Sequence, residues 1–223
     1  MRGFLFLLLL LSLKVSGQGG AAQPDVAKLK QARLDTMVAV IGITGSDIVA
    51  DIGSGNGYNL IRLSKYFPPA RYYAEDIDSA RCNRENFKKT IRDFRASVSI
   101  DSFTFRYGTT AATNLPENFF TKVLMIAVVH EFDEKQSMFA DIRSILQPGG
   151  FIFIEEPLVI HPVPKDKGCN NPYLTEAQLK RIISDNGLEI VMEKYIPDLG
   201  DNKYRKIFKC RLKTASSATI LLQ

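Results

Sequence analysis

The sequence predicts an α/β fold, a three-layer α/β/α sandwich around a mostly parallel sheet, on the strength of two observations. Short apolar strand-like runs alternate with helix-like segments along the chain, at spacings too wide for β-hairpins until the end. The run over residues 123–129 is apolar without a break, which is typical of a strand buried on both faces of a parallel sheet. The chain has 223 residues, of which 45% are hydrophobic, and this is enough for one such domain.

Residues 1–17 precede this pattern and predict a secretory signal peptide. Arg2 provides a positive start, and residues 4–13 form an apolar run that is too short to span a bilayer. Small residues then precede a predicted cleavage before Gln18. We therefore expect a secreted or periplasmic protein with no stable membrane insertion after cleavage. An uncleaved membrane anchor is the alternative.

The elements of the first half follow from apolar periodicity and from start and stop signals. Pro68-Pro69 stop the second helix, and Ser79 is the predicted N-cap of the third. The expected elements are a helix over 24–41, a strand over 47–52, a helix over 58–66, a strand over 71–75, a helix from 79 to about 92 and a strand over 102–107.

The second half shows the same alternation, and two S/T/D-x-x-Q patterns predict capping boxes at helix starts, Asp133 with Gln136 and Thr175 with Gln178. Residues 156–173 contain four prolines and no periodicity, so we expect an insertion there. The expected elements are a strand over 122–129, a helix over 133–146 stopped by Pro148-Gly149-Gly150, a strand over 151–155, a helix over 175–186 and an antiparallel pair over 188–195 and 204–212.

The pattern contains no linker, so one domain is expected over residues 45–213. Residues 18–44 form an N-terminal helical extension, and residues 214–223 a C-terminal tail. Without Arg2 and Lys14 of the leader, the net charge falls from +5 to +3. The chain has no Lys/Arg block and no aromatic-basic stripe, so we expect no nucleic-acid partner. The oligomeric state is left open.

The chain has three cysteines, Cys82, Cys169 and Cys210. Their spacing has no metal-ligand pattern, so the sequence predicts no metal site. An oxidising compartment would permit one disulfide and leave one thiol over. Which pair would form is left open.

A glycine-rich loop follows the first predicted strand, at the edge of the sheet where parallel α/β folds bind ligands. It reads Asp51-Ile52-Gly53-Ser54-Gly55-Asn56-Gly57. Glycines at alternate positions let the backbone turn sharply and approach a ligand, and Asp51 offers a carboxylate to an ammonium group. A dinucleotide fold would place the third glycine one residue later, so the spacing favours a zwitterionic amino-acid tail over a pyrophosphate.

The second predicted strand ends in the acidic stretch Glu75-Asp76-Ile77-Asp78. Asp76 lies about twenty residues after the glycine loop, the distance at which an acid can accept both hydroxyls of a ribose. Glu75 and Asp78 are the alternatives for this role. Loop and acid together predict a ligand that carries both an amino-acid tail and a nucleoside.

These residues resemble the class I S-adenosylmethionine (SAM)-dependent methyltransferases. The loop at 51–57 resembles the first motif of that family, Asp76 resembles its ribose-binding acid, and residues 142–150 resemble its helix and turn before strand five. The resemblance covers residues 26–212. It implies a Rossmann-like, seven-stranded sheet whose last strand is antiparallel, a methyltransferase activity, and SAM as the cofactor.

The resemblance also implies where the cofactor binds. The methionine end would lie at Asp51 and the glycine loop, the ribose on Asp76, and the adenine near Ile77 and the Gly108-Thr109 loop. Many family members carry an acid where this chain has Thr109, so this position departs from the pattern. The expected cofactor-binding residues are Asp51, Gly53, Ser54, Gly55, Gly57, Asp76, Ile77, Gly108 and Thr109.

Catalytic residues are less constrained, because methyl transfer needs a base only when the acceptor must lose a proton. The candidates are His130 and Glu131 at the exit of the fourth strand and His161 in the proline-rich insertion, with Glu155 and Glu156 at the exit of the fifth strand as further acids. Residues 18–44 and 156–173 would roof the acceptor pocket. Both segments are short, so a small-molecule methyl acceptor is expected.

Two other functions compete with this interpretation. SAM is made in the cytoplasm, so an exported protein could be a catalytically inactive SAM- or nucleoside-binding protein that shares every cofactor residue. An NAD-dependent oxidoreductase is the third hypothesis, and the glycine spacing argues against it.

Overall fold

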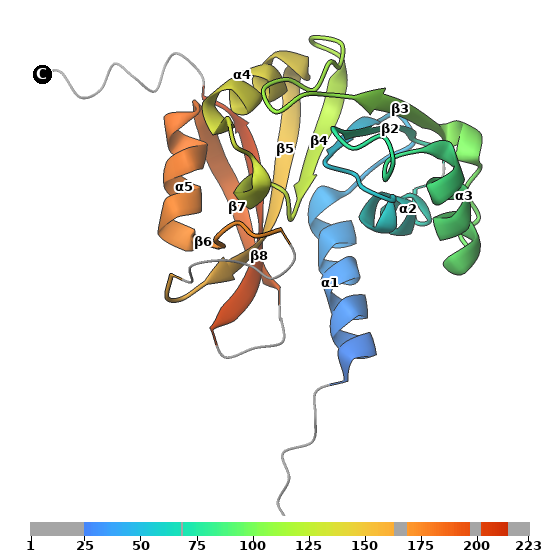
Figure 1. Cartoon of the computed structure of the whole chain (residues 1–223), viewed down its shortest axis with the longest axis horizontal. Helices are drawn as coiled ribbons and strands as arrows, with labels where there is room; N and C mark the ends of the chain where they lie inside the picture. The colour runs from blue at the N-terminus through green and yellow to red at the C-terminus, as the bar shows by residue number, and fades with distance from the viewer. Residues whose placement is uncertain (1–24, 68, 163–168, 197–201, 214–223) are drawn as a thin grey trace, which may run out of the picture.

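The computed structural model describes residues 25–67, 69–162, 169–196 and 202–213. Within these residues, one eight-stranded sheet is covered by helices on both faces, so the predicted α/β/α sandwich is confirmed (Figure 1). The predicted signal peptide at 1–17 and the tail at 214–223 lie outside the described residues. Among the residues described, no helix is long and apolar enough to cross a membrane.

The helices and strands alternate in the predicted order. The helices are α1 Val26–Ile41, α2 Tyr58–Ser64, α3 Arg84–Asp93, α4 Lys135–Ile145 and α5 Glu176–Asp185, with short 3-10 turns at Ile100–Ser102 and Val129–Glu131. The strands are β1 Ile48–Ile52, β2 Arg71–Asp76, β3 Phe103–Tyr107, β4 Phe120–Ile126, β5 Leu146–Val159, β6 Leu174–Thr175, β7 Leu188–Ile196 and β8 Lys203–Leu212.

The strand order is β3-β2-β1-β4-β5-β8-β7, with β6 paired to β5. Strands β1 to β5 pair in parallel, and β8 runs antiparallel between β5 and β7. The last strand is therefore antiparallel, as predicted. The two-residue strand β6 adds an eighth strand to the seven expected, because the chain before α5 pairs briefly with the far end of β5.

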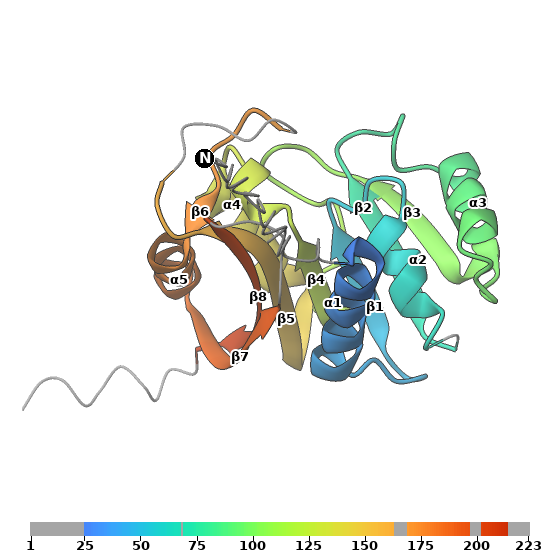
Figure 2. The ribbon, with the colours of Figure 1, turned by 90° about the horizontal axis from the view of Figure 1, so that it is seen from below.

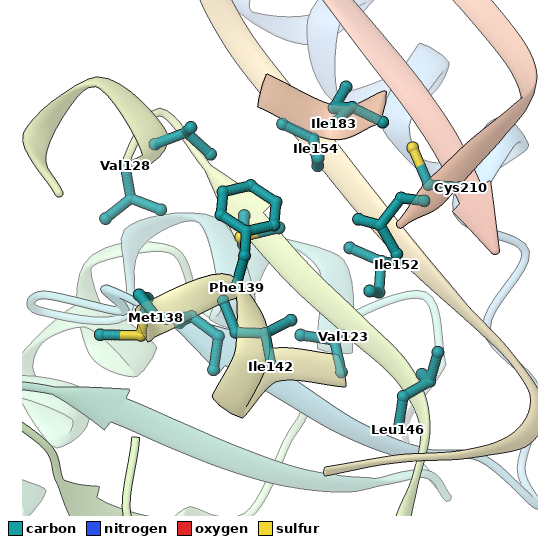
Figure 3. Close-up of a cluster of buried hydrophobic side chains, with 14 of the residues drawn as sticks. Val123, Val128, Met138, Phe139, Ile142, Leu146, Ile152, Ile154, Ile183 and Cys210 are labelled. Atoms are coloured by element: carbon teal, nitrogen blue, oxygen red, sulfur yellow. The ribbon is translucent and has the colours of Figure 1, made fainter. Parts of the chain in front are cut away.

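Two hydrophobic clusters hold the layers together. On one face, α4 and α5 pack on the sheet through residues such as Phe139, Ile142 and Ile183, which meet Val123 and Ile152 of the strands (Figure 3). On the other face, α1, α2 and α3 cover the sheet, and α1 lies against its β7–β8 side (Figure 2). The sheet is thus buried on both sides, which explains the continuous apolar run of β4.

Two predicted helix starts are wrong, and one is confirmed. Asn83, rather than Ser79, caps α3 by accepting the amide of Asn86. Helix α4 begins after Glu134 without a side-chain cap, so Asp133 and Gln136 do not form a capping box. The box of Thr175 with Gln178 is present at α5. At α3, Asp78 already satisfies the amides of Ala80 and Arg81 in a separate turn, which delays the helix.

Two strand boundaries also differ from the prediction. Strand β4 ends at Ile126, and Ala127 then adopts a left-handed backbone with φ +56°. Strand β5 runs to Val159, so the expected insertion at 156–173 begins only after it, and residues 163–168 lie outside the described residues. The antiparallel pairing with β8 extends β5 beyond the length that apolar periodicity shows.

Candidate functional site

A cavity of about 430 Å³ opens at the carboxyl ends of β1, β2 and β4. This size lies within the range of small-molecule sites, about 300–1,000 Å³. The predicted site residues that line it are Gly53, Ser54, Gly55, Asp76, Ile77, Thr109 and Glu131. Segments from the four connections after β1, β2, β3 and β4 therefore meet at one edge of the sheet, as the ligand rule for parallel sheets requires.

The glycine loop after β1 forms one wall of the cavity. Gly53 has φ +70°, and a Cβ there would lie 2.4 Å from Cγ2 of Val128. The Ser54 amide donates to the carbonyl of Glu75 at 2.8 Å, and the Gly55 amide donates to Oδ2 of Asp76 at 2.8 Å. The loop thus packs against the exit of β4 on one side and is hydrogen-bonded to the end of β2 on the other.

Asp51 lies beneath this loop and does not line the cavity. Its side chain is buried, and its Oδ2 accepts the hydroxyl of Ser54 at 2.7 Å. Burial raises the pKa of Asp51 to about 7, although the Ser54 hydrogen bond works against the shift. Asp51, the carboxylate predicted to meet a ligand ammonium group, is therefore connected to the cavity through its hydrogen bond with Ser54, which does line the cavity.

Asp76 forms the floor of the cavity at the end of β2. Oδ1 accepts the amide of Asp78 at 2.8 Å, while Oδ2 accepts that of Gly55. These two bonds fix the carboxylate where it faces the glycine loop. Ile77 follows with a side chain that is 60% exposed and lines the cavity, so it offers an apolar surface next to the acid.

The loop after β3 contributes Thr109, whereas Gly108 and Gly57 do not line the cavity. The hydroxyl oxygen of Thr109 accepts the amides of Ala111 and Ala112, so this side chain stabilises its own turn. Gly57 is the N-cap residue of α2 and shapes the loop from behind. Of the three glycines in the loop, Gly53 and Gly55 therefore line the cavity, and Gly57 precedes the first residue of α2.

Glu75 is a buried carboxyl at the same place, which the sequence offered only as an alternative to Asp76. It lines the cavity, and its Oε1 has no hydrogen-bond partner among the described residues. Burial, together with the charge of Asp76, raises the pKa of Glu75 to about 8. The Gly108 position must lack a side chain, because a Cβ there would lie 2.2 Å from this Oε1.

His130 lies in the turn after β4, held by a buried acid. Its Nδ1 is 2.8 Å from Oε2 of Glu156, whose Oε1 accepts the Val129 amide at 2.6 Å. Burial raises the pKa of Glu156, and the imidazole opposes this shift. Glu131 lines the cavity, and its Oε1 is 3.8 Å from Nε2 of His130. The structure therefore brings Glu131 to the cavity rim, whereas His130 is buried beside it and does not line the cavity.

His161 does not join them. It is exposed, does not line the cavity, and its backbone amide and carbonyl bond to the side chain of Asn202. Sequence reasoning placed it over the site because the insertion was expected to start at residue 156. The extension of β5 instead carries His161 past the sheet edge.

Sequence reasoning missed several lining residues, chiefly Arg81, Phe132 and Met138. Phe132 and Met138 fit a helical apolar pattern equally well, so their sequence signal is that of core residues. Arg81 lies in the turn before α3, which the sequence assigned to the helix. No local motif distinguishes these positions.

The three cysteines are free thiols, so the one disulfide that an oxidising compartment would permit is not formed. Cys82 and Cys210 are buried as thiols in the two separate hydrophobic clusters, on opposite faces of the sheet. No disulfide joins them. Cys169 is partly exposed and lies near His130 and Glu131, where the ligand atoms of the three side chains are within 4.8 Å of one another.

Comparison with known proteins agrees with this geometry. Residues 50–154 match a family described as a methyltransferase domain, a stretch that runs from β1 through most of β5 and contains the glycine loop, Asp76 and His130. Among curated protein sequences, none matches the chain.

Solved structures share the fold at low sequence identity. A SAM-dependent methyltransferase from Aquifex aeolicus has a TM-score of 0.63 and 16% identity, covering 84% of this chain and 98% of that one. Geranyl diphosphate C-methyltransferase from Streptomyces coelicolor has a TM-score of 0.65 and 12% identity, covering 82% and 79%. The [4+2]-cyclase SpnF has a TM-score of 0.68 and 14% identity, covering 82% of each chain.

These findings establish the Rossmann-like methyltransferase fold. Residues 50–154 are thus similar to a methyltransferase domain, and the chain shares its fold with SAM-dependent methyltransferases. The cyclase among the neighbours is a reminder that one fold serves more than one reaction.

Proposed function

We propose that this chain, which carries a methyltransferase domain on a Rossmann-like fold, is a SAM-dependent methyltransferase that acts on a small-molecule acceptor. The observation that carries the proposal is the cavity, because the glycine-rich loop and Asp76 both line it and are joined by the hydrogen bond from the Gly55 amide to the Asp76 carboxylate. An amino-acid tail and a ribose need those two surfaces side by side. SAM supplies an electrophilic methyl group on a sulfonium, and the chain's residues bind and orient it.

The residues present fit this cofactor. Gly53 and Gly55 let the methionine end approach the backbone, and Ser54 links that wall to the buried Asp51. Asp76 would accept the ribose hydroxyls, and Ile77 would pack against the adenine. Glu75, with an unpaired buried oxygen at the cavity, would hydrogen-bond the cofactor where Thr109 replaces the more usual acid.

On the acceptor side, the rim of the cavity holds Glu131, with His130 beside it. The bond from His130 to Glu156 fixes the orientation of the ring, which is how a general base is positioned. His161 is not part of this proposal, because its side chain is not at the cavity. A small acceptor is proposed because the segments expected to cover it, residues 18–44 and 156–173, are short, and no nucleic-acid partner because the sequence has no Lys/Arg block and no aromatic-basic stripe.

Export is a separate part of the proposal. It rests on the leader at residues 1–17, and the secreted or periplasmic location follows from that leader alone. A protein that binds SAM or a nucleoside without transfer is the second candidate. It is favoured by one observation: His130, the predicted base, does not itself line the cavity.

Calorimetry with S-adenosylhomocysteine tests the cofactor site. Asp76→Ala should weaken binding by about 1–3 kcal/mol, since it removes a charged acceptor from two hydroxyls. Asp78→Ala is the matched control, because Asp78 also lines the cavity and was the alternative acid. Equal losses in both variants, or no loss in Asp76→Ala, would place the ribose elsewhere.

Methyl transfer is tested separately. Purified protein, labelled SAM and a pool of small metabolites should yield a labelled product that is not protein-bound. Binding of S-adenosylhomocysteine without label transfer to any pool would favour the second candidate.

A further inference from the structure

A second group of side chains lies beside the cofactor cavity and has the chemistry of a metal centre. His130, Glu131 and Cys169 offer one nitrogen, one carboxylate oxygen and one sulfur, all within 4.8 Å of one another. They come from two distant parts of the chain, the turn after β4 and the segment before β6. The sequence spacing has no metal-ligand pattern, so this grouping exists only in the folded protein.

We propose that His130, Glu131 and Cys169 bind one divalent transition-metal ion of the Zn²⁺ class. A nitrogen, an oxygen and a sulfur donor are the ligands such ions take, whereas Mg²⁺ and Ca²⁺ prefer oxygen alone. Three protein ligands leave a fourth position open, as in catalytic rather than structural zinc sites.

The distances are close to those of a bound site. Zn–N and Zn–S bonds of about 2.1 and 2.3 Å place tetrahedral ligand atoms about 3.5 Å apart. Nε2 of His130 and Oε1 of Glu131 are already 3.8 Å apart. Cys169 would close the site by a shift of about 1 Å, and its segment is only partly buried.

The buried acid behind the histidine is the independent observation. Oε2 of Glu156 lies 2.8 Å from Nδ1 of His130, and the Glu156 side chain is fully buried. A carboxylate that accepts the Nδ1 proton fixes the tautomer whose Nε2 lone pair can bind a metal. Carboxylate–histidine–metal arrangements of this kind recur in zinc proteins.

Charge supports the same conclusion. Carboxyl groups lie on both sides of the His130 imidazole, Glu156 at 2.8 Å from Nδ1 and Glu131 at 3.8 Å from Nε2. A divalent cation at Nε2 would be attracted to these groups and would bind Cys169 as the thiolate. Glu131 also lines the cofactor cavity, so the ion would border it. If the proposed methyltransferase function holds, an oxygen or sulfur of the acceptor could take the fourth position, and the ion, in place of His130 as a base, would promote the loss of the acceptor's proton.

Cobalt substitution of the full-length protein tests the site. After treatment with a chelator, the protein is titrated with Co²⁺, whose bond to a thiolate produces a near-ultraviolet charge-transfer band, and then with Zn²⁺ as competitor. We expect one ion per chain, a band that Zn²⁺ abolishes, and no band in Cys169→Ser. A wild-type protein without the band, or a band that persists in Cys169→Ser, overturns the proposal.

Two further variants test Glu131 and Glu156 by substitutions that keep the size of the side chain. Glu131→Gln should weaken Zn²⁺ binding at least tenfold, and Glu156→Gln by about 10–100-fold, as expected for the acid behind a histidine ligand. Glu117→Gln, an exposed carboxylate in the turn before β4, is the matched control and should bind as wild type does. Equal affinity in Glu131→Gln and Glu117→Gln contradicts the site.

The same samples separate this proposal from the methyltransferase function. Cys169 does not line the cofactor cavity, so Cys169→Ser should lose the metal and still bind S-adenosylhomocysteine. Wild-type protein that binds S-adenosylhomocysteine but no metal refutes the metal site alone. Protein that binds metal but not S-adenosylhomocysteine refutes the cofactor assignment alone.

Discussion

Gly53 and Gly55 have similar backbone conformations but different surroundings. Both have positive φ, +70° and +55°, where an L side chain costs about 1–2 kcal/mol. A Cβ on Gly53 would also meet Val128 at 2.4 Å, whereas the nearest atom at Gly55 is a mobile Arg81 nitrogen at 3.5 Å. The first glycine is therefore required by packing as well as by backbone geometry.

We predict that Gly53→Ala destabilises the protein more than Gly55→Ala. The expected difference is about 1–3 kcal/mol, the usual cost of forcing extra atoms into a packed site. Urea unfolding of the two variants beside wild type measures it. Equal losses would mean that Val128 moves aside freely and that the loop is not packed against β4.

The buried acids Asp51 and Glu75 predict a pH dependence. Their pKa values are raised by burial to about 7 and about 8, so the folded state holds their protons more tightly than the unfolded chain does. The stabilisation is complete below about pH 4 and is lost as the pH rises through those values. Each group lowers the free energy of unfolding by up to ~1.4 kcal/mol per pH unit within its window.

Glu75→Gln tests this dependence. The variant keeps the side-chain shape but does not titrate, so its stability should fall less than that of wild type between about pH 5 and about pH 8. Urea unfolding across that range measures the difference, with the exposed Glu117→Gln as control. Parallel curves for Glu75→Gln and wild type would show that Glu75 ionises normally in the folded protein.

At the level of residues, the sequence predicted the site residues that directly follow a strand. It missed the site residues that lie further along the connections between strands. Gly53, Asp76 and Ile77 were predictable, because strand ends in a parallel sheet share one edge. The partnership of His130 with Glu156 was not, since it depends on the register between β4 and β5. The contact with Cys169 depends on the path of the chain after β5, which has no periodic signal.

Among the elements, α1 is tied to the sheet by one buried charge cluster. Arg33 donates two hydrogen bonds to the carboxylate of Glu155, at 3.0 and 2.7 Å, and Arg205 of β8 donates to the same group. Glu155 is fully buried at the end of the parallel part of β5. This helix therefore packs through polar as well as apolar contacts, and the predicted helical extension is part of the fold.

Arg33→Met should loosen this attachment. We expect a loss of about 1–3 kcal/mol in the free energy of unfolding, because a buried carboxylate loses two charge-assisted bonds and keeps only those from Arg205. Lys28→Met is the control on the same helix, since Lys28 pairs with Asp25 in solvent and should cost little. A loss in Lys28→Met as large as that in Arg33→Met would contradict this assignment.

Element types were predictable from periodicity, whereas several boundaries were not. Every predicted helix and strand exists. However, α3 is capped by Asn83 instead of Ser79, and α4 begins after Glu134 without the predicted Asp133–Gln136 capping box. A capping motif competes with local turns, and Asp78 shows such a turn by bonding the amides of Ala80 and Arg81. The length of β5 is set by its antiparallel partner β8 rather than by its own residues.

For the whole molecule, the sheet order decides where the ligand binds. Strand β1 lies inside the sheet, with β2 on one side and β4 on the other, so the loops after these three strands meet at one edge of the sheet. The sequence predicted a ligand at the carboxyl ends of the strands, because alternating strands and helices indicate a parallel sheet, but it did not predict the strand order. The strand β6 could not be predicted from the sequence, because a strand of two residues shows no periodicity.

Ligand-induced stabilisation of the intact chain tests this arrangement, because any ligand that binds only the folded state stabilises it by mass action. S-adenosylhomocysteine at a hundredfold excess over its dissociation constant should add about 2.7 kcal/mol and raise the melting temperature accordingly. NADH should add nothing, because the third glycine of the loop comes one residue too early for a pyrophosphate. In Asp76→Ala, the same concentration of S-adenosylhomocysteine should produce a smaller rise in the melting temperature.

A higher melting temperature with NADH and none with S-adenosylhomocysteine would identify the cavity as a dinucleotide site. Both ligands would meet the same strand ends, and the spacing of the glycines in the loop is what distinguishes them.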